Sequence, residues 1–138
     1  DEDFKKSNLH KLPNVYFLGR KDGSELPNYV KGFDVAMNPQ LINNLTIGNY
    51  PRKIDEYLAM GKPIIATKTK AMEMFKDCVY LGSTKEEYVS LIEKALAENS
   101  KELAEKRMNV AKGHSWTNNV GAIYNAIIKA TKHKIKWD

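Results

Sequence analysis

The clearest indication of the fold lies in one continuous segment: Pro51-Arg52-Lys53-Ile54-Asp55-Glu56-Tyr57-Leu58-Ala59-Met60-Gly61-Lys62-Pro63-Ile64-Ile65-Ala66-Thr67. Apolar residues recur in its first half at helical spacing, and we expect three of them to be buried: Ile54, Tyr57 and Leu58. Pro51 suits the first helical position because an N–H there would have no partner, and Gly61 is a typical helix end. The adjacent aliphatics after Pro63 are typical of an interior parallel strand. The stretch therefore predicts a helix over 51–61 and a strand over 62–67.

The chain on both sides continues the alternation of strands and helices. Short runs of β-branched, aromatic and aliphatic residues predict three further strands, over 14–19, 34–39 and 78–82. Helices are predicted over 24–32, with Ser24 as a candidate cap, and over 83–98, where Ser83 and Thr84 each open a capping-box pattern. Two more helices are expected, over 101–112 and from Ser115 onward. The last of these carries an apolar stripe: Val120, Ile123, Tyr124, Ile127 and Ile128.

This alternation predicts an α/β fold, a Rossmann-like parallel sheet flanked by helices, because parallel strands need crossovers and the crossovers cover the sheet. In such sheets, ligands bind beyond the carboxyl ends of the strands. Three loops follow predicted strands at that edge: 19–21, 39–50 and 67–69. We expect these loops to converge on a ligand.

Composition limits the kind of protein. The 138 residues fit one domain, and the single cysteine, Cys78, excludes an intrachain disulfide and fits a reducing cytoplasm. No apolar run approaches the roughly 20 residues needed to cross a bilayer, so we expect a soluble chain. The net charge of +5 is concentrated in the last ten residues, Lys129–Asp138. This basic end fits a solvated helix end or an anionic membrane surface, whereas nucleic acid is disfavoured because the aromatic residues lie away from the lysines.

The loop and helix around Pro51 carry the residues with ligand chemistry. Gly48 and Asn49 lead into a helix N-terminus, whose free N–H groups favour an anion such as phosphate. Lys53 in the first turn opposes the helix dipole unless a bound anion compensates, although a solvated lysine explains it equally well. The two oxygens of Glu56 suit a ribose diol, or the residue is an ordinary surface carboxylate. His10, His114 and His133 lie far apart without partners at ligand spacing, so no metal site is expected.

These motifs together resemble a known enzyme family. The segment Pro51-x-Lys53-x-x-Glu56-Tyr57-Leu58-Ala59-x-Gly61-Lys62-Pro63-Ile64-Ile65 is similar to the donor site of retaining GT-B glycosyltransferases of the group 1, family 4-like type, which build bacterial surface polysaccharides. The resemblance covers nearly the whole chain and is carried further by Val15-Tyr16-Phe17-Leu18-Gly19, Leu26-Pro27-x-Tyr29, Asp34-Val35, Arg107, Ala111, Ser115-Trp116 and Tyr124.

The resemblance implies roles for individual residues. It assigns Glu56 to the nucleotide ribose and Lys53 to the diphosphate, and it places Gly19 and Arg20 at the nucleobase. The family's other donor-site glutamate, which contacts the sugar, is absent here because Gly48 stands at its position. Polar residues of the same loop are candidates to replace it, and with Tyr50 they complete the candidate donor site: Asn43, Asn44, Thr46 and Asn49. No catalytic nucleophile, metal or cofactor is implied; the donor is expected to be a UDP- or GDP-linked sugar.

The resemblance also implies that residues 1–138 are part of a larger enzyme. We expect a partial C-terminal donor-binding domain without its first two strands, separated from the N-terminal acceptor domain and inactive by itself. Ser115-Trp116 resembles the place where the last helix bends back towards that domain. The whole enzyme would transfer sugar to a lipid-linked or polysaccharide acceptor at the cytoplasmic face of the inner membrane.

Two further expectations follow from this reading. Unpaired strands at the sheet edges are expected to promote dimerisation of the isolated chain. The alternative function is a non-catalytic Rossmann-like nucleotide-binding or protein-interaction module, because a fold alone does not fix an activity.

Overall fold

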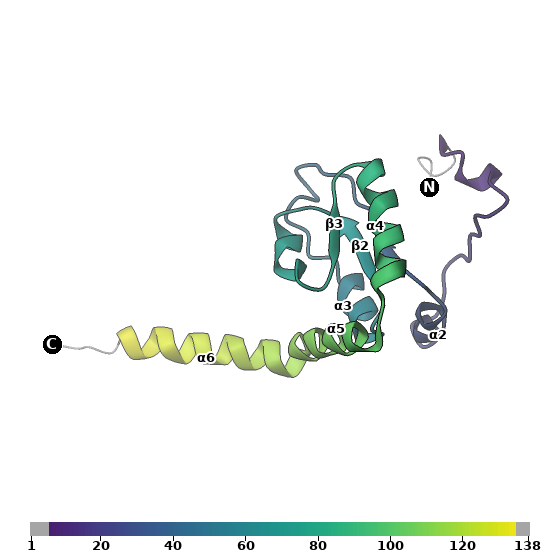
Figure 1. Cartoon of the computed structure of the whole chain (residues 1–138). Coiled ribbons are helices and arrows are strands. Elements are labelled where there is room, and N and C mark those ends of the chain that lie inside the picture. The colour runs from purple at the N-terminus through teal and green to yellow at the C-terminus, as the bar shows by residue number, and fades with distance from the viewer. Residues whose placement is uncertain (1–5, 135–138) are drawn as a thin grey trace.

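The computed structural model describes residues 6–134, and of 132–134 it describes the backbone alone. Its elements are η1 (Leu9–Lys11), α2 (Leu26–Lys31), β1 (Ala36–Asn38), α3 (Lys53–Ala59), β2 (Ile64–Thr67), η2 (Ala71–Phe75), β3 (Tyr80–Gly82), α4 (Lys85–Glu98), α5 (Lys101–Gly113) and α6 (Trp116–Lys134). The strands form a parallel sheet in the order β1-β2-β3, with helices packed against it (Figure 1). The predicted α/β class with a Rossmann-like parallel sheet is confirmed.

The central strand β2 separates two helical layers. Ile64 and Ala66 belong to the main core cluster with Leu58 of α3 and Phe75 of η2. On the other face, the Thr67 hydroxyl lies 2.9 Å from the hydroxyl of Tyr88 in α4. Successive side chains of a strand point to opposite faces, so a strand covered on both sides is apolar throughout. Every residue of β2 is accordingly buried.

The helix α3 fixes the position of the predicted site. Ile54 and Leu58 are fully buried as expected, while Tyr57 is only partly buried against the core. The helix begins at Lys53 and not at Pro51, because Pro51 and Arg52 form the preceding turn, in which the Pro51 carbonyl accepts from the Ile54 N–H at 2.9 Å. Burying the apolar face of α3 against β1 and β2 holds its polar face towards solvent.

The turn from α3 into β2 is fixed by a glycine and a buried arginine. Gly61 has a φ of +66°, and a Cβ there would lie 3.1 Å from Cβ of Ala104 in α5. Arg107 of α5 is 3% exposed and donates to the Gly61 carbonyl at 3.1 Å and to the Asn99 side chain at 3.0 Å. These contacts explain why α5 lies against α3.

Helix caps follow the sequence in most cases. Thr84, Ser100 and Ser115 each accept a hydrogen bond from an N–H in the first turn of α4, α5 and α6. Glu87 completes the cap of α4 by accepting from the Ser83 N–H. The predicted cap at Ser24 is wrong, because the Ser24 hydroxyl donates to Asp22 and α2 starts without a side-chain cap.

The predicted strand over 14–19 does not form in this structure. None of its residues belongs to a strand, and three of them are exposed by 79%, 51% and 53%: Tyr16, Phe17 and Leu18. The segment runs apart from the sheet (Figure 1). A strand needs a neighbour to satisfy its N–H and C=O groups, and no described strand lies beside this one. The described sheet therefore has three strands where four were expected.

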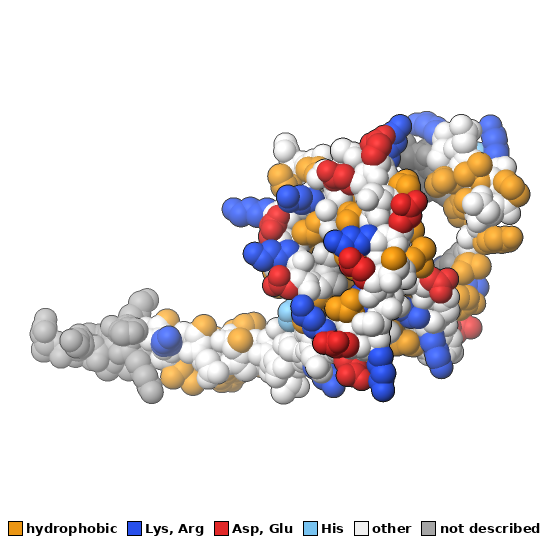
Figure 2. Space-filling view, viewed as in Figure 1, with side chains coloured by type: hydrophobic (Ala, Val, Ile, Leu, Met, Phe, Trp, Pro, Cys, Tyr) orange, Lys and Arg blue, Asp and Glu red, His pale blue; other side chains and the backbone are white. Residues whose placement is uncertain are grey.

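The helix α6 leaves the domain as a long rod (Figure 1). Its apolar stripe forms as predicted but lies in solvent, with Val120 exposed by 45% and Tyr124 by 66%, and apolar side chains are visible along the rod in Figure 2. The basic end begins within α6 at Lys129; the side chains of 132–134 and the residues 135–138, with Lys136 and Trp137 among them, lie outside the described part. No helix in the described part of the chain is both long and apolar enough to cross a bilayer.

Candidate functional site

Two of the three predicted loops meet at the carboxyl edge of the sheet. The Gln40 N–H, just after β1, donates to the Thr67 hydroxyl at the end of β2 over 2.7 Å. The loop 19–21 does not join them: it lies on the other side of α4 in Figure 1, and the Lys21 ammonium packs over the Tyr29 ring instead. Gly19 and Arg20 are exposed there, so the structure does not bring these predicted nucleobase contacts to the edge.

A groove of about 480 Å³ opens where the loop 39–50 runs into α3, and we call it the α3 groove. It is lined by Asn38, Pro39, Gln40, Thr46, Asn49, Tyr50, Pro51, Arg52 and Lys53. Four of the predicted donor-site residues therefore share one groove: Thr46, Asn49, Tyr50 and Lys53. The groove lies at the carboxyl end of β1, where α/β folds bind ligands.

Two adjacent cations give the α3 groove a positive wall. Arg52 and Lys53 are both exposed, and within the described residues neither side chain makes a hydrogen bond or a salt bridge. Sequence reasoning singled out Lys53 and missed Arg52, although the two are neighbours in the chain. Paired cations beside polar side chains suit an anion that carries several oxygens, such as a diphosphate.

Two hydroxyls of the α3 groove already have partners within the protein. The Thr46 hydroxyl donates to the Leu41 carbonyl and accepts from the Asn43 N–H at 3.0 Å, which closes the loop on itself. The Tyr50 hydroxyl donates to Oδ2 of Asp55 at 2.6 Å. Burial and then this bond to Asp55 raise the pKa of Tyr50 well above its ordinary value. Asn49, whose side chain makes no such bond within the described residues, is the more available polar group.

Glu56 lies one turn along α3 from Lys53 but outside the α3 groove. It lines a mainly apolar hollow of about 370 Å³ with residues of α2, among them Leu26 and Pro27. It also lines a groove of about 620 Å³ towards α6, together with Tyr50, Arg52, Asp55, His114, Trp116 and Asn119. Residues one turn apart are neighbours on a helix surface, so Lys53 and Glu56 share the exposed face of α3. Arg52 lines both this groove and the α3 groove, so a ligand in contact with both Lys53 and Glu56 would pass over the Arg52 side chain.

A network of three polar side chains joins distant segments beside these grooves. Asp55 accepts from Tyr50 through one carboxylate oxygen, and its other oxygen lies 2.8 Å from Nδ1 of His114. The Phe75 ring packs against both aromatic partners, with centroids 5.6 Å from Tyr50 and 5.4 Å from His114. No pattern in the sequence predicts this network, because spacing within the chain says nothing about contacts between distant residues.

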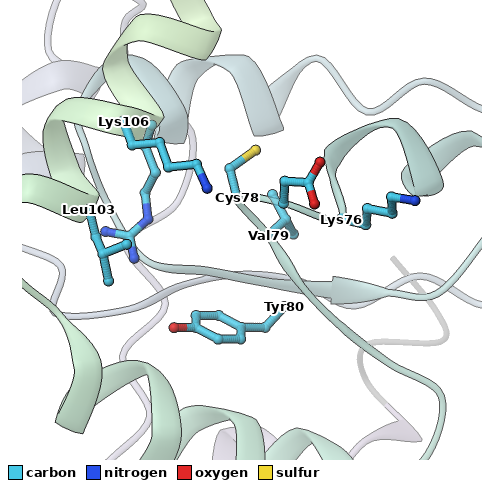
Figure 3. A pocket seen from close by; sticks show the side chains of 8 residues that line it. Lys76, Cys78, Val79, Tyr80, Leu103 and Lys106 are labelled. Carbon is cyan, nitrogen blue, oxygen red and sulfur yellow. The ribbon is translucent and has the colours of Figure 1, made fainter.

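A small pocket of about 100 Å³ lies at the amino end of β3, away from the grooves (Figure 3). Cys78, Tyr80 and Lys106 are among the residues that line it. Cys78 is half-buried; burial raises the pKa of its thiol, which is typical of an unreactive cysteine. The structure brings together no group of three or more His, Cys, Asp or Glu side chains suited to a metal among the residues that it describes.

Comparison with known proteins identifies the family. The sequence profile of the glycosyl transferases group 1 family matches residues 1–112, so the chain belongs to that family. It is similar to the putative teichuronic acid biosynthesis glycosyltransferase TuaH of Bacillus subtilis (strain 168), with 30% identity over 128 residues that cover 89% of this chain. The chain spans 31% of the length of that relative. No solved structure matches it.

Proposed function

We propose that this chain is the nucleotide-diphosphate-sugar-binding part of a retaining GT-B glycosyltransferase. The donor would be a UDP- or GDP-linked sugar, and the chain would be a partial C-terminal domain of the whole enzyme. Membership of the glycosyl transferases group 1 family supports a transferase. The name of the relative from Bacillus subtilis supports a surface polysaccharide as the product.

One observation carries the proposal, namely the pair Arg52 and Lys53 in a groove at the carboxyl edge of a parallel sheet. Neither side chain has a partner among the described residues, and guanidinium and ammonium groups are the side chains that hold phosphates. We propose that they bind the diphosphate, with Asn49 contacting the sugar in place of the glutamate missing at Gly48. Thr46 would act by keeping the loop closed, since its hydroxyl is already used there.

Glu56 and the segment 14–20 complete the proposed donor site. Glu56 would accept hydrogen bonds from the ribose on the exposed face of α3. Gly19 and Arg20 would contact the nucleobase once a neighbouring strand lets 14–19 pair and return to the sheet. This part of the proposal requires a neighbouring strand from a part of the enzyme outside residues 6–134.

The remaining partners belong to the whole enzyme. We propose that an N-terminal domain holds a lipid-linked or polysaccharide acceptor at the cytoplasmic face of the inner membrane and covers the exposed face of α6 around Trp116, which is 75% exposed. Without that domain the chain would be inactive, and its outer strand edges would favour homodimers, which light scattering detects.

Titration calorimetry with UDP, GDP and an oligonucleotide tests the proposal. We expect the chain to bind one of the two nucleotides and not the oligonucleotide, and Glu56→Gln to weaken that binding. A non-catalytic nucleotide-binding module would bind in the same way, so the enzyme joined to its missing domain is then assayed for sugar transfer. Absence of binding to either nucleotide by both chains would overturn the proposed function.

A further inference from the structure

We infer that His114 is a positioning residue for the α3 groove: through Asp55 it holds Tyr50, and with Tyr50 the end of the loop that forms the groove wall. His114 lies between α5 and α6, far from the groove in sequence. The inference concerns the placement of the loop, and only its consequence for nucleotide binding rests on the proposed function.

The carboxylate of Asp55 is the centre of this arrangement. An ionised carboxylate only accepts hydrogen bonds, so the Tyr50 hydroxyl and Nδ1–H of His114 must both be donors. Each uses a different oxygen, at 2.6 Å and 2.8 Å. The side chains of His114 and Asp55 are 26% and 29% exposed, so water competes only in part for their contact. Bonds to a charged acceptor in such a setting are stronger than those between neutral groups.

The loop before Tyr50 has few other contacts with the body of the domain. Two of its aliphatic residues, Leu41 and Leu45, are 85% and 91% exposed. Its hydrogen bonds through Asn43 and Thr46 stay within the loop. Among the described residues, the Gln40 N–H ties its start to Thr67, and Tyr50 ties its end to Asp55. A loop held at two points loses its placement when one of them is released.

His114 contacts the Asp55 oxygen that Tyr50 does not use, and its Nδ1 also lies 3.4 Å from the Tyr50 hydroxyl. Phe75 fills the space beneath Tyr50 and His114, so the two rings and the carboxylate form one packed unit. Removing the imidazole leaves Oδ1 of Asp55 without its partner and frees the carboxylate to turn towards water. Tyr50 then loses a fixed acceptor, and the wall of the α3 groove loses its anchor.

Amide hydrogen exchange on the full chain tests the placement of the loop. The amides of Thr46, Ile47 and Asn49 each donate to a loop carbonyl. In His114→Ala we expect these amides to exchange at least about threefold faster, while the β2 amides keep the wild-type rate. His114→Asn, which retains a side-chain donor, should restore most of the protection. Tyr50→Phe removes the hydroxyl that bonds Asp55 and lies 3.4 Å from Nδ1 of His114, while it leaves the imidazole in place, and it should reproduce the effect of His114→Ala.

Two results would overturn the inference. One is unchanged loop exchange in both His114→Ala and Tyr50→Phe; the other is equal acceleration of the loop and of β2, which would mean general destabilisation. Calorimetry with UDP and GDP tests the consequence, and we expect His114→Ala to bind about three- to tenfold more weakly and His114→Asn to recover. If the wild-type chain binds neither nucleotide, the proposed function fails while the exchange result still decides the placement of the loop.

Discussion

Nδ1 of His114 lies 2.8 Å from Oδ1 of Asp55, although 59 positions of sequence separate the two residues. This contact joins the α5–α6 junction to the first turn of α3, and it differs from the exposed ion pairs on the helix surfaces. Lys101 and Glu105, for example, lie 4.0 Å apart with side chains exposed by 92% and 58%. The energetic coupling across the two kinds of pair should therefore differ.

A double-mutant cycle in urea measures that coupling. We expect the double variant of His114→Ala and Asp55→Ala to lose about 1 kcal/mol less unfolding free energy than the sum of the two single variants. Either substitution alone already breaks the contact between the two side chains. The same cycle at Lys101 and Glu105 should give about 0.3–0.5 kcal/mol, as exposed helix pairs do. Additive losses at His114 and Asp55 would show that the contact contributes nothing in solution.

Gly61→Ala should destabilise the domain strongly. An alanine is strained at the positive φ of this position. Its Cβ would also lie 3.1 Å from the Cβ and 3.3 Å from the backbone oxygen of Ala104. We expect a loss of about 2 kcal/mol or more in unfolding free energy, measured by urea denaturation. Gly113→Ala, at a position with open space around it, is the matched control and should change stability little. Comparable losses in both variants would contradict the role given to the turn.

Arg107→Ala should be costly for a different reason. The buried guanidinium satisfies the Gly61 carbonyl and the Asn99 side chain, and its removal leaves a void with unpaired polar groups. We expect a loss of about 2–4 kcal/mol in thermal or urea unfolding. Lys106→Ala, on the exposed face of the same helix, serves as the control. A small effect at Arg107 would mean that water replaces its bonds.

Alkaline pH should weaken the fold through its tyrosines. Burial and the bond to Asp55 raise the pKa of Tyr50 above its ordinary value of 10.0, and burial raises the pKa of Tyr57 and Tyr88 as well. The unfolded chain therefore gives up these protons at a lower pH than the folded one. The resulting stabilisation is fully present below about pH 10 and is lost as pH rises further.

Urea midpoints on both sides of that pH check the prediction. We expect the midpoint to fall between about pH 8 and about pH 11, and Tyr50→Phe to lose less over the same interval. Tyr16→Phe, at a position that is 79% exposed, is the control and should behave as the wild type does. A midpoint that stays constant over this range would show that these phenols gain no protection from folding.

Lys53→Ala should weaken nucleotide binding without affecting the fold. If the α3 groove holds a diphosphate, the loss of one charge-assisted contact should lower the affinity for UDP or GDP about tenfold. Arg52→Ala should do the same, and the salt dependence of binding should decrease in both variants. Lys101→Ala, remote from the groove on α5, provides the comparison. Equal affinities in all of these variants would place the phosphates elsewhere.

Much of the candidate site could be anticipated because it lies in one continuous piece of chain. Thr46, Asn49, Tyr50 and Lys53 share a groove since the loop and the start of α3 are adjacent in sequence. Glu56 was grouped with them through the resemblance to the donor site of the glycosyltransferases, yet it lines two other hollows, because it lies one turn further along α3. Sequence reasoning missed Arg52 in the groove and His114 behind it.

By itself, the sequence determined those elements whose stability depends on local pattern. The buried strand Ile64–Thr67, the apolar face of α3 and the caps at Thr84, Ser100 and Ser115 follow from periodicity and from hydrogen bonds within one turn. Only the tertiary structure decided which segments pair across the chain. The run 14–19 has strand chemistry, but none of the described strands lies beside it, and a strand forms only by pairing with a neighbour. Likewise, Arg107 and His114 acquired their partners from packing, because contacts between distant residues depend on the arrangement of the whole core.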